Sequence, residues 1–110
     1  MYELFFRFPG GTDRAVTLSY DDGVEQDQRI IALLKSHRMK GTFNINGNLF
    51  HPENTPHDPN KIARRFPESK IREIYLNETA EVAIHGFRHM WMACLPKGAA
   101  YEIVEDRKKL

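Results

Sequence analysis

The amino-acid sequence predicts an α/β fold built from parallel βα units. Three short apolar runs with strand character are each followed by a stretch of helical periodicity, an alternation typical of parallel sheets. Polar side chains suited to a functional site follow the first and third runs directly. Ligands of α/β proteins bind at the carboxyl ends of strands, so the same pattern predicts where the site lies.

The first βα unit begins with a strand expected over residues 15–20, where larger apolar side chains alternate with smaller ones in a period of two. A helix is expected over about 24–38, because Ile30, Ile31 and Leu34 recur at helical spacing. Acidic residues in its first turn and a glycine shortly after its end support these boundaries.

The second unit contains a strand expected over 42–46, followed by a long connection that carries four prolines. Such connections are usually functional or disordered. A helix is expected over roughly 68–77, with Ile71, Ile74 and Tyr75 on one side.

The third unit begins with an apolar, buried-looking strand over 81–84 that ends at a histidine. The last helix is expected from residue 98 or 99 to 110, with Ile103 and Val104 facing the core. Three units cannot close an eight-stranded barrel, which typically takes about 250 residues. The predicted sheet therefore has open edges, and we expect either a piece of a longer protein or a homodimer across one edge.

Composition narrows the class of protein. The chain has 110 residues, 41% of them hydrophobic and 28% charged, as in an ordinary globular domain. A net charge of +1 favours no nucleic-acid partner, and the basic stretch Lys61, Arg64, Arg65, Lys70 and Arg72 is interpreted as a solvated surface.

Other composition signals concern compartment and membrane. No apolar run reaches the eighteen or so residues of a membrane span, so no membrane partner is expected. Residues 1–6 are too short and too soon charged for a signal-peptide core, which makes a cytoplasmic location the default. Cys94 has no cysteine partner and is interpreted as a packing residue.

Two motifs suggest a site. Asp21 and Asp22 precede Gly23 after the first strand, and His85 and His89 follow the third. One carboxylate and two imidazoles can hold a divalent metal while a second carboxylate transfers protons. Alone, the acidic triplet is also a common turn or helix cap, and the histidine pair also occurs on exposed helices without a metal. Both aspartates can serve one pocket only if the chain leaves strand geometry there, which the glycine permits.

These residues resemble signatures of a known family. Residues 19–23, Ser-Tyr-Asp-Asp-Gly, resemble the first signature of the polysaccharide deacetylases of the NodB-homology group, carbohydrate esterase family 4. Residues 85–89 resemble the second, and residues 15–18 and 40–44 are similar to the first two barrel strands. The chain departs from the family at Gly86, where a hydroxyl residue is usual, and it has no counterpart of the later signatures, which carry an arginine, an oxyanion-binding turn and a general-acid histidine.

The resemblance implies a distorted barrel of seven or eight strands, of which residues 1–110 supply about the first three βα units. It implies a metal-dependent hydrolase that removes N- or O-acetyl groups from a glycan. Asp22, His85 and His89 match the metal ligands and Asp21 matches the general base. Zinc is the default ion from the ligand types, with cobalt, nickel or manganese as alternatives.

Weaker candidates and alternative functions stay open. Asn44 and Asn46 end the second strand and could hydrogen-bond a sugar, although asparagine there is more often part of a turn. Trp91 could stack on a pyranose ring, but a core position is favoured. One alternative is a catalytically incomplete fragment that binds metal or carbohydrate. Another is a structural α/β module whose acidic turn and histidines are incidental.

Overall fold

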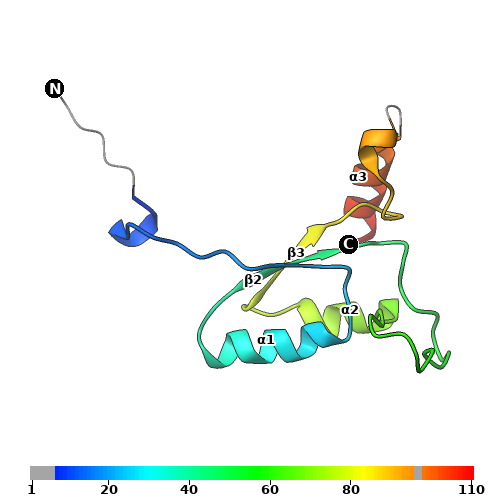
Figure 1. Ribbon diagram of the computed structural model, residues 1–110, viewed down its shortest axis with the longest axis horizontal. Coiled ribbons are helices and arrows are strands. Elements are labelled where there is room, and N and C mark those ends of the chain that lie inside the picture. Colours follow the sequence, from blue (N-terminus) through cyan, green and yellow to red (C-terminus); the bar gives the residue numbers. More distant parts are fainter. Residues whose placement is uncertain (1–6, 96–97) are drawn as a thin grey trace.

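The computed structural model describes residues 7–95 and 98–110 as a mixed α/β structure with three parallel strands in the order β1-β2-β3 (Figure 1). The strands are β1 (Ser19–Asp21), β2 (Gly41–Ile45) and β3 (Ala80–Ile84), and the α-helices are α1 (Gln26–Ser36), α2 (Glu68–Tyr75) and α3 (Ala99–Lys109). The predicted class, element order and parallel pairing are confirmed. The sheet is open, and closure into a barrel stays a prediction.

Strand register brings the carboxyl ends of the strands together. Strand β1 pairs with β2 from Ser19 opposite Thr42 to Asp21 opposite Asn44. Strand β2 pairs with β3 along its whole length and ends with Ile45 opposite Ile84. The segments that leave β1, β2 and β3 therefore start at the same end of the sheet, beside one another. The candidate site residues were expected at this end.

Strand β1 is shorter than predicted. The alternation of side chains indicated residues 15–20, but only three residues, Ser19–Asp21, form the strand. Its neighbour β2 starts at Gly41, so the segment before Leu18 has no partner strand, and Val16 is 79% exposed. Figure 1 shows this segment extending away from the sheet. Period-two alternation was the correct signal for a strand but overestimated its length.

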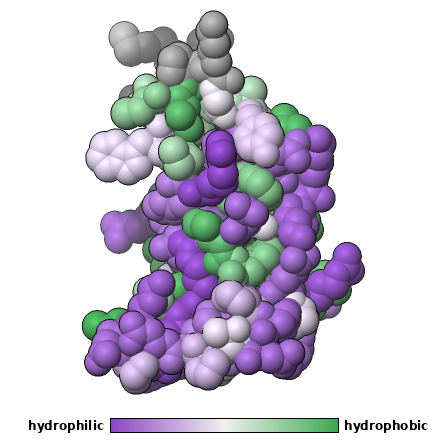
Figure 2. All heavy atoms as spheres, turned by 90° about the vertical axis from the view of Figure 1, so that its right-hand side faces the viewer, coloured by the Kyte–Doolittle hydropathy of each residue, from purple (hydrophilic) through white to green (hydrophobic). Residues whose placement is uncertain are grey.

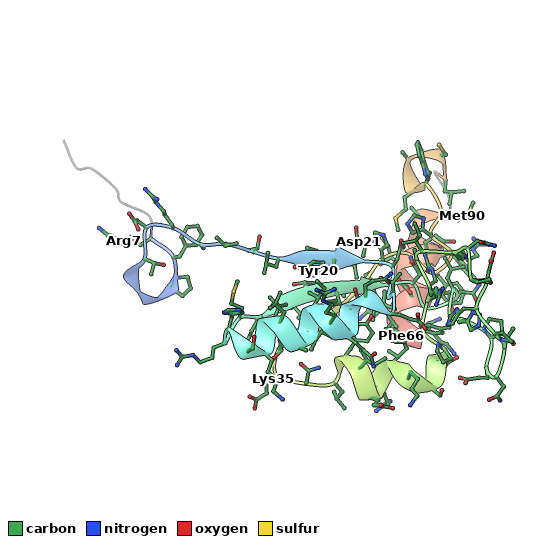
Figure 3. All side chains as sticks on the ribbon, turned by 60° about the horizontal axis from the view of Figure 1, so that its bottom comes forward. Arg7, Tyr20, Asp21, Lys35, Phe66 and Met90 are labelled. Carbon is green, nitrogen blue, oxygen red and sulfur yellow. The ribbon has the colours of Figure 1, made fainter. Side chains whose placement is uncertain are left out.

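The hydrophobic core lies between the sheet and helices α1 and α2, which cover the same face (Figures 1 and 3). Its buried residues come from both helices, from β2 and from the connection before α2: Ile31, Leu34, Phe43, Ile45, Phe66, Ile74 and Tyr75. Burial of each large apolar side chain stabilises the fold by about 1.5–3 kcal/mol. The predicted apolar sides of α1 and α2 are confirmed.

Strand β3 is not buried as expected. Val82 lies opposite Phe43 in the register and Ile84 opposite Ile45, so both belong to the face that forms the core. Strand β3 is nevertheless an edge of this sheet, and both side chains are exposed. The apolar face thus continues to an uncovered edge. Dimerisation there stays a prediction.

Helix α3 is rotated relative to the prediction. Ile103 and Val104, expected in the core, are 43% and 48% exposed. Glu102 and Asp106 are fully buried instead. The physical reason is the position of the helix: α3 stands at the carboxyl ends of the strands rather than over the apolar face (Figure 1), and it meets backbone N–H groups there.

Two further expectations can be compared with the structure. Cys94 is an exposed free thiol, so its interpretation as a packing residue is wrong. Within residues 7–95 and 98–110, no helix combines the length and apolar character needed to cross a membrane. Residues 1–6, on which the signal-peptide argument rests, lie outside the described residues.

Candidate metal centre

Three residues from two distant motifs converge beyond the carboxyl ends of the strands. Each of Asp22, His85 and His89 offers a ligand atom, and these atoms lie within 4.8 Å of one another. Asp22 Oδ1 is 3.5 Å from His89 Nε2 and 4.0 Å from His85 Nε2. The structure thus brings together the three residues that sequence reasoning proposed as metal ligands.

The turn after β1 directs Asp22 out of the strand. Asp22 has a φ of 79° and Gly23 a φ of 67°, so the chain leaves strand geometry at both residues. The left-handed region costs a non-glycine residue roughly 1–2 kcal/mol, although aspartate tolerates it better than most. The Asp22 N–H donates to the Asn44 carbonyl at 2.9 Å, which ties the turn to β2.

The histidine motif forms a turn rather than a helix. Gly86 has a φ of 86° and His89 a φ of 55°, and the His89 N–H donates to the Gly86 carbonyl at 3.3 Å. The two imidazole rings lie edge to face, with centroids 5.0 Å apart. The exposed-helix interpretation of His-x-x-x-His therefore does not apply, because a tight reversal rather than helical periodicity brings the rings together.

Asn46 steadies this turn. Its side chain is buried, and its amide NH2 donates to the carbonyls of His85 and Gly86 at 2.9 and 2.7 Å. Gly86 lacks the hydroxyl that the family usually has there, and at its positive φ a side chain would be strained. In this chain Asn46 provides a hydrogen-bonded support for the loop between the histidines.

Arg65 contacts the candidate ligand Asp22 directly, although sequence reasoning did not place it at the site. Its guanidinium donates to Asp22 Oδ1 and to Asn46 Oδ1, both at 2.9 Å. The interpretation of Arg65 as part of a solvated basic surface is wrong. No local signal distinguishes it from its neighbours Arg64 and Lys61, because its partners lie 19 and 43 residues away in the chain.

Asp21 is the last residue of β1, and its side chain is exposed at the carboxyl end of that strand (Figure 3). Its Oδ1 accepts a hydrogen bond from the Asn44 amide at 2.8 Å, and the same amide also donates to Ser19 Oγ. Asn44 therefore holds both aspartates, Asp21 through its side chain and Asp22 through its carbonyl.

Trp91 follows the second histidine and is 80% exposed, so the favoured core interpretation is wrong for this residue. Figure 2 looks onto this end of the molecule and shows apolar residues set among polar ones. Phe87 in the same segment is partly buried. Its ring lies edge to face with that of Tyr101 of α3, with the ring centroids 6.2 Å apart.

Two carboxyls near the site have pKa values shifted in opposite directions. Burial raises the pKa of Asp27 in the first turn of α1, and hydrogen bonds from Tyr75 and Val24 only partly oppose it. Burial also acts to raise the pKa of Glu102, but hydrogen bonds from the Arg88 N–H and guanidinium outweigh it and lower the value. Burial and the Asp27 carboxylate raise the pKa of Tyr75.

Comparison with known proteins identifies the family of this chain. The family model described as Polysaccharide deacetylase matches residues 8–110. No curated protein and no solved structure matches the chain significantly. The family match covers almost the whole chain and includes Asp22, His85 and His89. The chain therefore belongs to the polysaccharide deacetylase family.

Proposed function

We propose that this chain is a metal-dependent hydrolase domain that removes N- or O-acetyl groups from a glycan. The convergence of Asp22, His85 and His89 from two separate motifs carries the proposal. Family membership supports the deacetylase class of reaction and an acetylated carbohydrate as the substrate.

The spacing and ligand types of the three residues support a divalent ion. Ligand bonds to zinc are about 2.0–2.2 Å long, so two ligands of one ion lie no more than about 4.4 Å apart. The separations of 3.5 and 4.0 Å from Asp22 Oδ1 to the two imidazole nitrogens lie within that limit, and the ligand atoms of all three residues lie within 4.8 Å of one another. Two imidazoles and a carboxylate suit zinc, cobalt, nickel or manganese, of which zinc is the default.

A bound ion would supply a Lewis acid that lowers the pKa of water and polarises the acetyl carbonyl. The residues of the chain carry out the other tasks. We assign to Asp21 the role of general base: Asn44 holds its Oδ1, which leaves Oδ2 to take the proton from the attacking water. Arg65 places a positive charge beside Asp22 and fixes the oxygen that faces the histidines.

The exposure and hydrogen bonding of side chains near the histidine turn suggest which of them contact the substrate. We place Trp91 as a platform on which a sugar ring stacks, because its ring is largely exposed beside the histidine turn. The side-chain amides of Asn44 and Asn46 already donate to groups within the chain. Their place in this proposal is to position Asp21 and the histidine loop rather than to contact the sugar directly.

Metal titration tests this proposal. Purified chain should bind one equivalent of Co²⁺ or Zn²⁺, and Asp22→Ala or His85→Ala should abolish that binding. His37→Ala is the matched control, because this exposed histidine ends α1 outside the site and its loss should leave binding unchanged. Equal occupancy in all four proteins would refute the ligand assignment.

A second candidate, a metal-binding domain without turnover, is favoured by the openness of the site. The side chains of Asp22 and His89 are 37% and 47% exposed, whereas catalysis gains from excluding water. Absence of an oxyanion donor typically costs about 10²–10³-fold in turnover and absence of a general acid about 10²–10⁴-fold. Hydrolysis of an acetylated oligosaccharide or a simple acetyl ester by the metal-loaded chain would exclude this candidate.

A further inference from the structure

Helix α3 presents carboxylates to the protein and apolar side chains to solvent. Glu102 and Asp106, one helical turn apart, are both 0% exposed. Ile103 and Val104 between them are exposed. A buried carboxylate is unfavourable unless hydrogen bonds or positive charge satisfy it, so the partners of these two groups show what the helix does.

Asp106 joins the ends of two strands. Its Oδ1 accepts from the N–H of Gly47, just beyond β2. Its Oδ2 accepts at 2.9 Å from the N–H of His85, just beyond β3, and this N–H also donates to the Ile45 carbonyl at 3.0 Å. A Cβ at position 47 would lie 2.8 Å from Asp106 Oδ1, so only glycine permits this approach. The Asp106 side chain thus links the two strand ends and adds to the hydrogen bond from β2 that holds the backbone at the first histidine.

Glu102 holds the loop that follows. Its Oε2 accepts from the Arg88 N–H at 2.7 Å, and its Oε1 accepts from the Arg88 guanidinium at 2.6 and 2.7 Å. The Glu102 carbonyl accepts from the Phe87 N–H at 3.2 Å. Helix α3 therefore contacts the backbone at positions 85, 87 and 88, between and beside the two histidines.

We propose that Glu102 and Asp106 are positioning residues of the metal centre, which hold the second histidine motif in the conformation that directs both imidazoles toward Asp22. His89 has a positive φ, a conformation that a non-glycine residue keeps only where the surroundings determine it. The two carboxylates add to the support from Asn46 through charge-assisted hydrogen bonds to the backbone. This inference rests on the metal site proposed above.

Metal affinity of folded variants tests the role. Asp106→Asn keeps the shape of the side chain but places an NH2 group against a backbone N–H, so it should weaken Co²⁺ binding by about 10–100-fold. Glu102→Gln should act in the same direction. Leu34→Ala in the core is the control: it should lower stability while its folded molecules bind Co²⁺ with wild-type affinity. Affinities of both carboxylate variants within twofold of the wild type would overturn the inference.

Amide hydrogen exchange of the wild-type chain without metal gives an independent measurement that needs no variant to fold. The Gly47 and Arg88 amides, whose N–H groups donate to the two carboxylates, should exchange clearly more slowly than unprotected loop amides. Exchange as fast as in an unfolded chain would overturn the positioning role. If the wild type binds no Co²⁺, the proposed function fails; if it binds and both carboxylate variants bind equally well, only this inference fails.

Discussion

Helices α1 and α2 are held to the sheet by apolar contact, whereas helix α3 is held by buried carboxylates. In the apolar layer, formed by α1, α2 and the sheet, Ile31, Leu34 and Ile74 belong to the core with residues of β2. In the carboxylate layer, formed by α3 and the segments it contacts, Glu102 and Asp106 accept hydrogen bonds from backbone N–H groups beyond β2 and β3. Apolar burial is non-directional and supplies stability, while hydrogen bonds to ionised groups are directional and fix geometry. The difference teaches that stability and site geometry are provided by separate parts of this small structure.

The apolar layer should show the largest effect on stability. Phe43→Ala removes a fully buried ring. Its centroid lies 5.3 Å from that of the stacked Tyr20 ring and 5.5 Å from that of the tilted Tyr75 ring. We expect a loss of about 3–5 kcal/mol in the free energy of unfolding, measured by urea denaturation. Val82→Ala, at the register partner of Phe43 on the exposed edge, should cost clearly less. Equal losses would contradict the location of the core.

The carboxylate layer should respond to acid. Glu102→Gln should cost about 1–3 kcal/mol at neutral pH, because a donor then faces the Arg88 donors. The folded pKa of Glu102 is lowered, so its contribution is complete above the ordinary value of 4.5 and is lost as pH falls through the folded value. The stability difference from the wild type should therefore narrow in acid. A difference independent of pH would contradict this assignment.

The histidine turn gives the next effect. Gly86→Ser introduces the kind of residue usual in the family, but at a φ of 86° and with its Cβ 3.2 Å from Met92 Cε. We expect thermal denaturation to show a loss of about 1–2 kcal/mol from backbone strain. Gly98→Ser, at a glycine with helical φ and ordinary contacts, is the control and should cost less. A stabilising Gly86→Ser would mean that the turn adopts another conformation.

Asp27 in the apolar layer should show the opposite pH dependence to Glu102. Its folded pKa is raised, so the stability it contributes is complete below the ordinary value of 3.8 and is lost as pH rises through the folded value. Relative to Asp27→Asn, the wild type should be most favoured in acid and should lose part of that advantage as pH rises toward neutral. Urea denaturation across the range checks this, and a wild type that gains relative stability with rising pH would refute it.

The smallest effect is expected on the outer side of α3. Ile103→Ala shortens an exposed side chain and should change the free energy of unfolding by no more than about 0.5 kcal/mol, as measured by thermal or urea denaturation. Leu34→Ala on α1, at a buried leucine, is the contrast and should cost several times more. A loss above 2 kcal/mol at Ile103 would mean that this side of α3 is covered in solution.

Much of the fold was predictable because its signals are local. Apolar periodicity identified α1, α2 and the order of strands and helices, and parallel pairing followed from their alternation. Strand ends and turn residues also located the candidate site, since Asp22 and His85 follow parallel strands whose carboxyl ends lie at the same end of the sheet. Their convergence with His89 matched the expectation from the sequence, whereas the identity of the metal stays a prediction.

The errors share one physical cause. The exposure of Ile103, the burial of Glu102 and the contact between Arg65 and Asp22 each depend on partners far away in the chain. Periodicity identifies an apolar stripe, but it does not say whether apolar side chains or backbone N–H groups will meet the helix. Charged residues are rarely fully buried, so prior expectation also favoured the wrong side of α3.

The sequence alone determined the elements, their parallel order and the ends at which the aspartates and histidines lie, because these depend on side-chain spacing and turn chemistry over a few residues. Only the tertiary structure decided which side of α3 is buried, how Arg65 and Asn46 support the site, and how far the strands extend. Those outcomes depend on hydrogen-bond donors and partner strands that distant segments provide, and only folding brings them together.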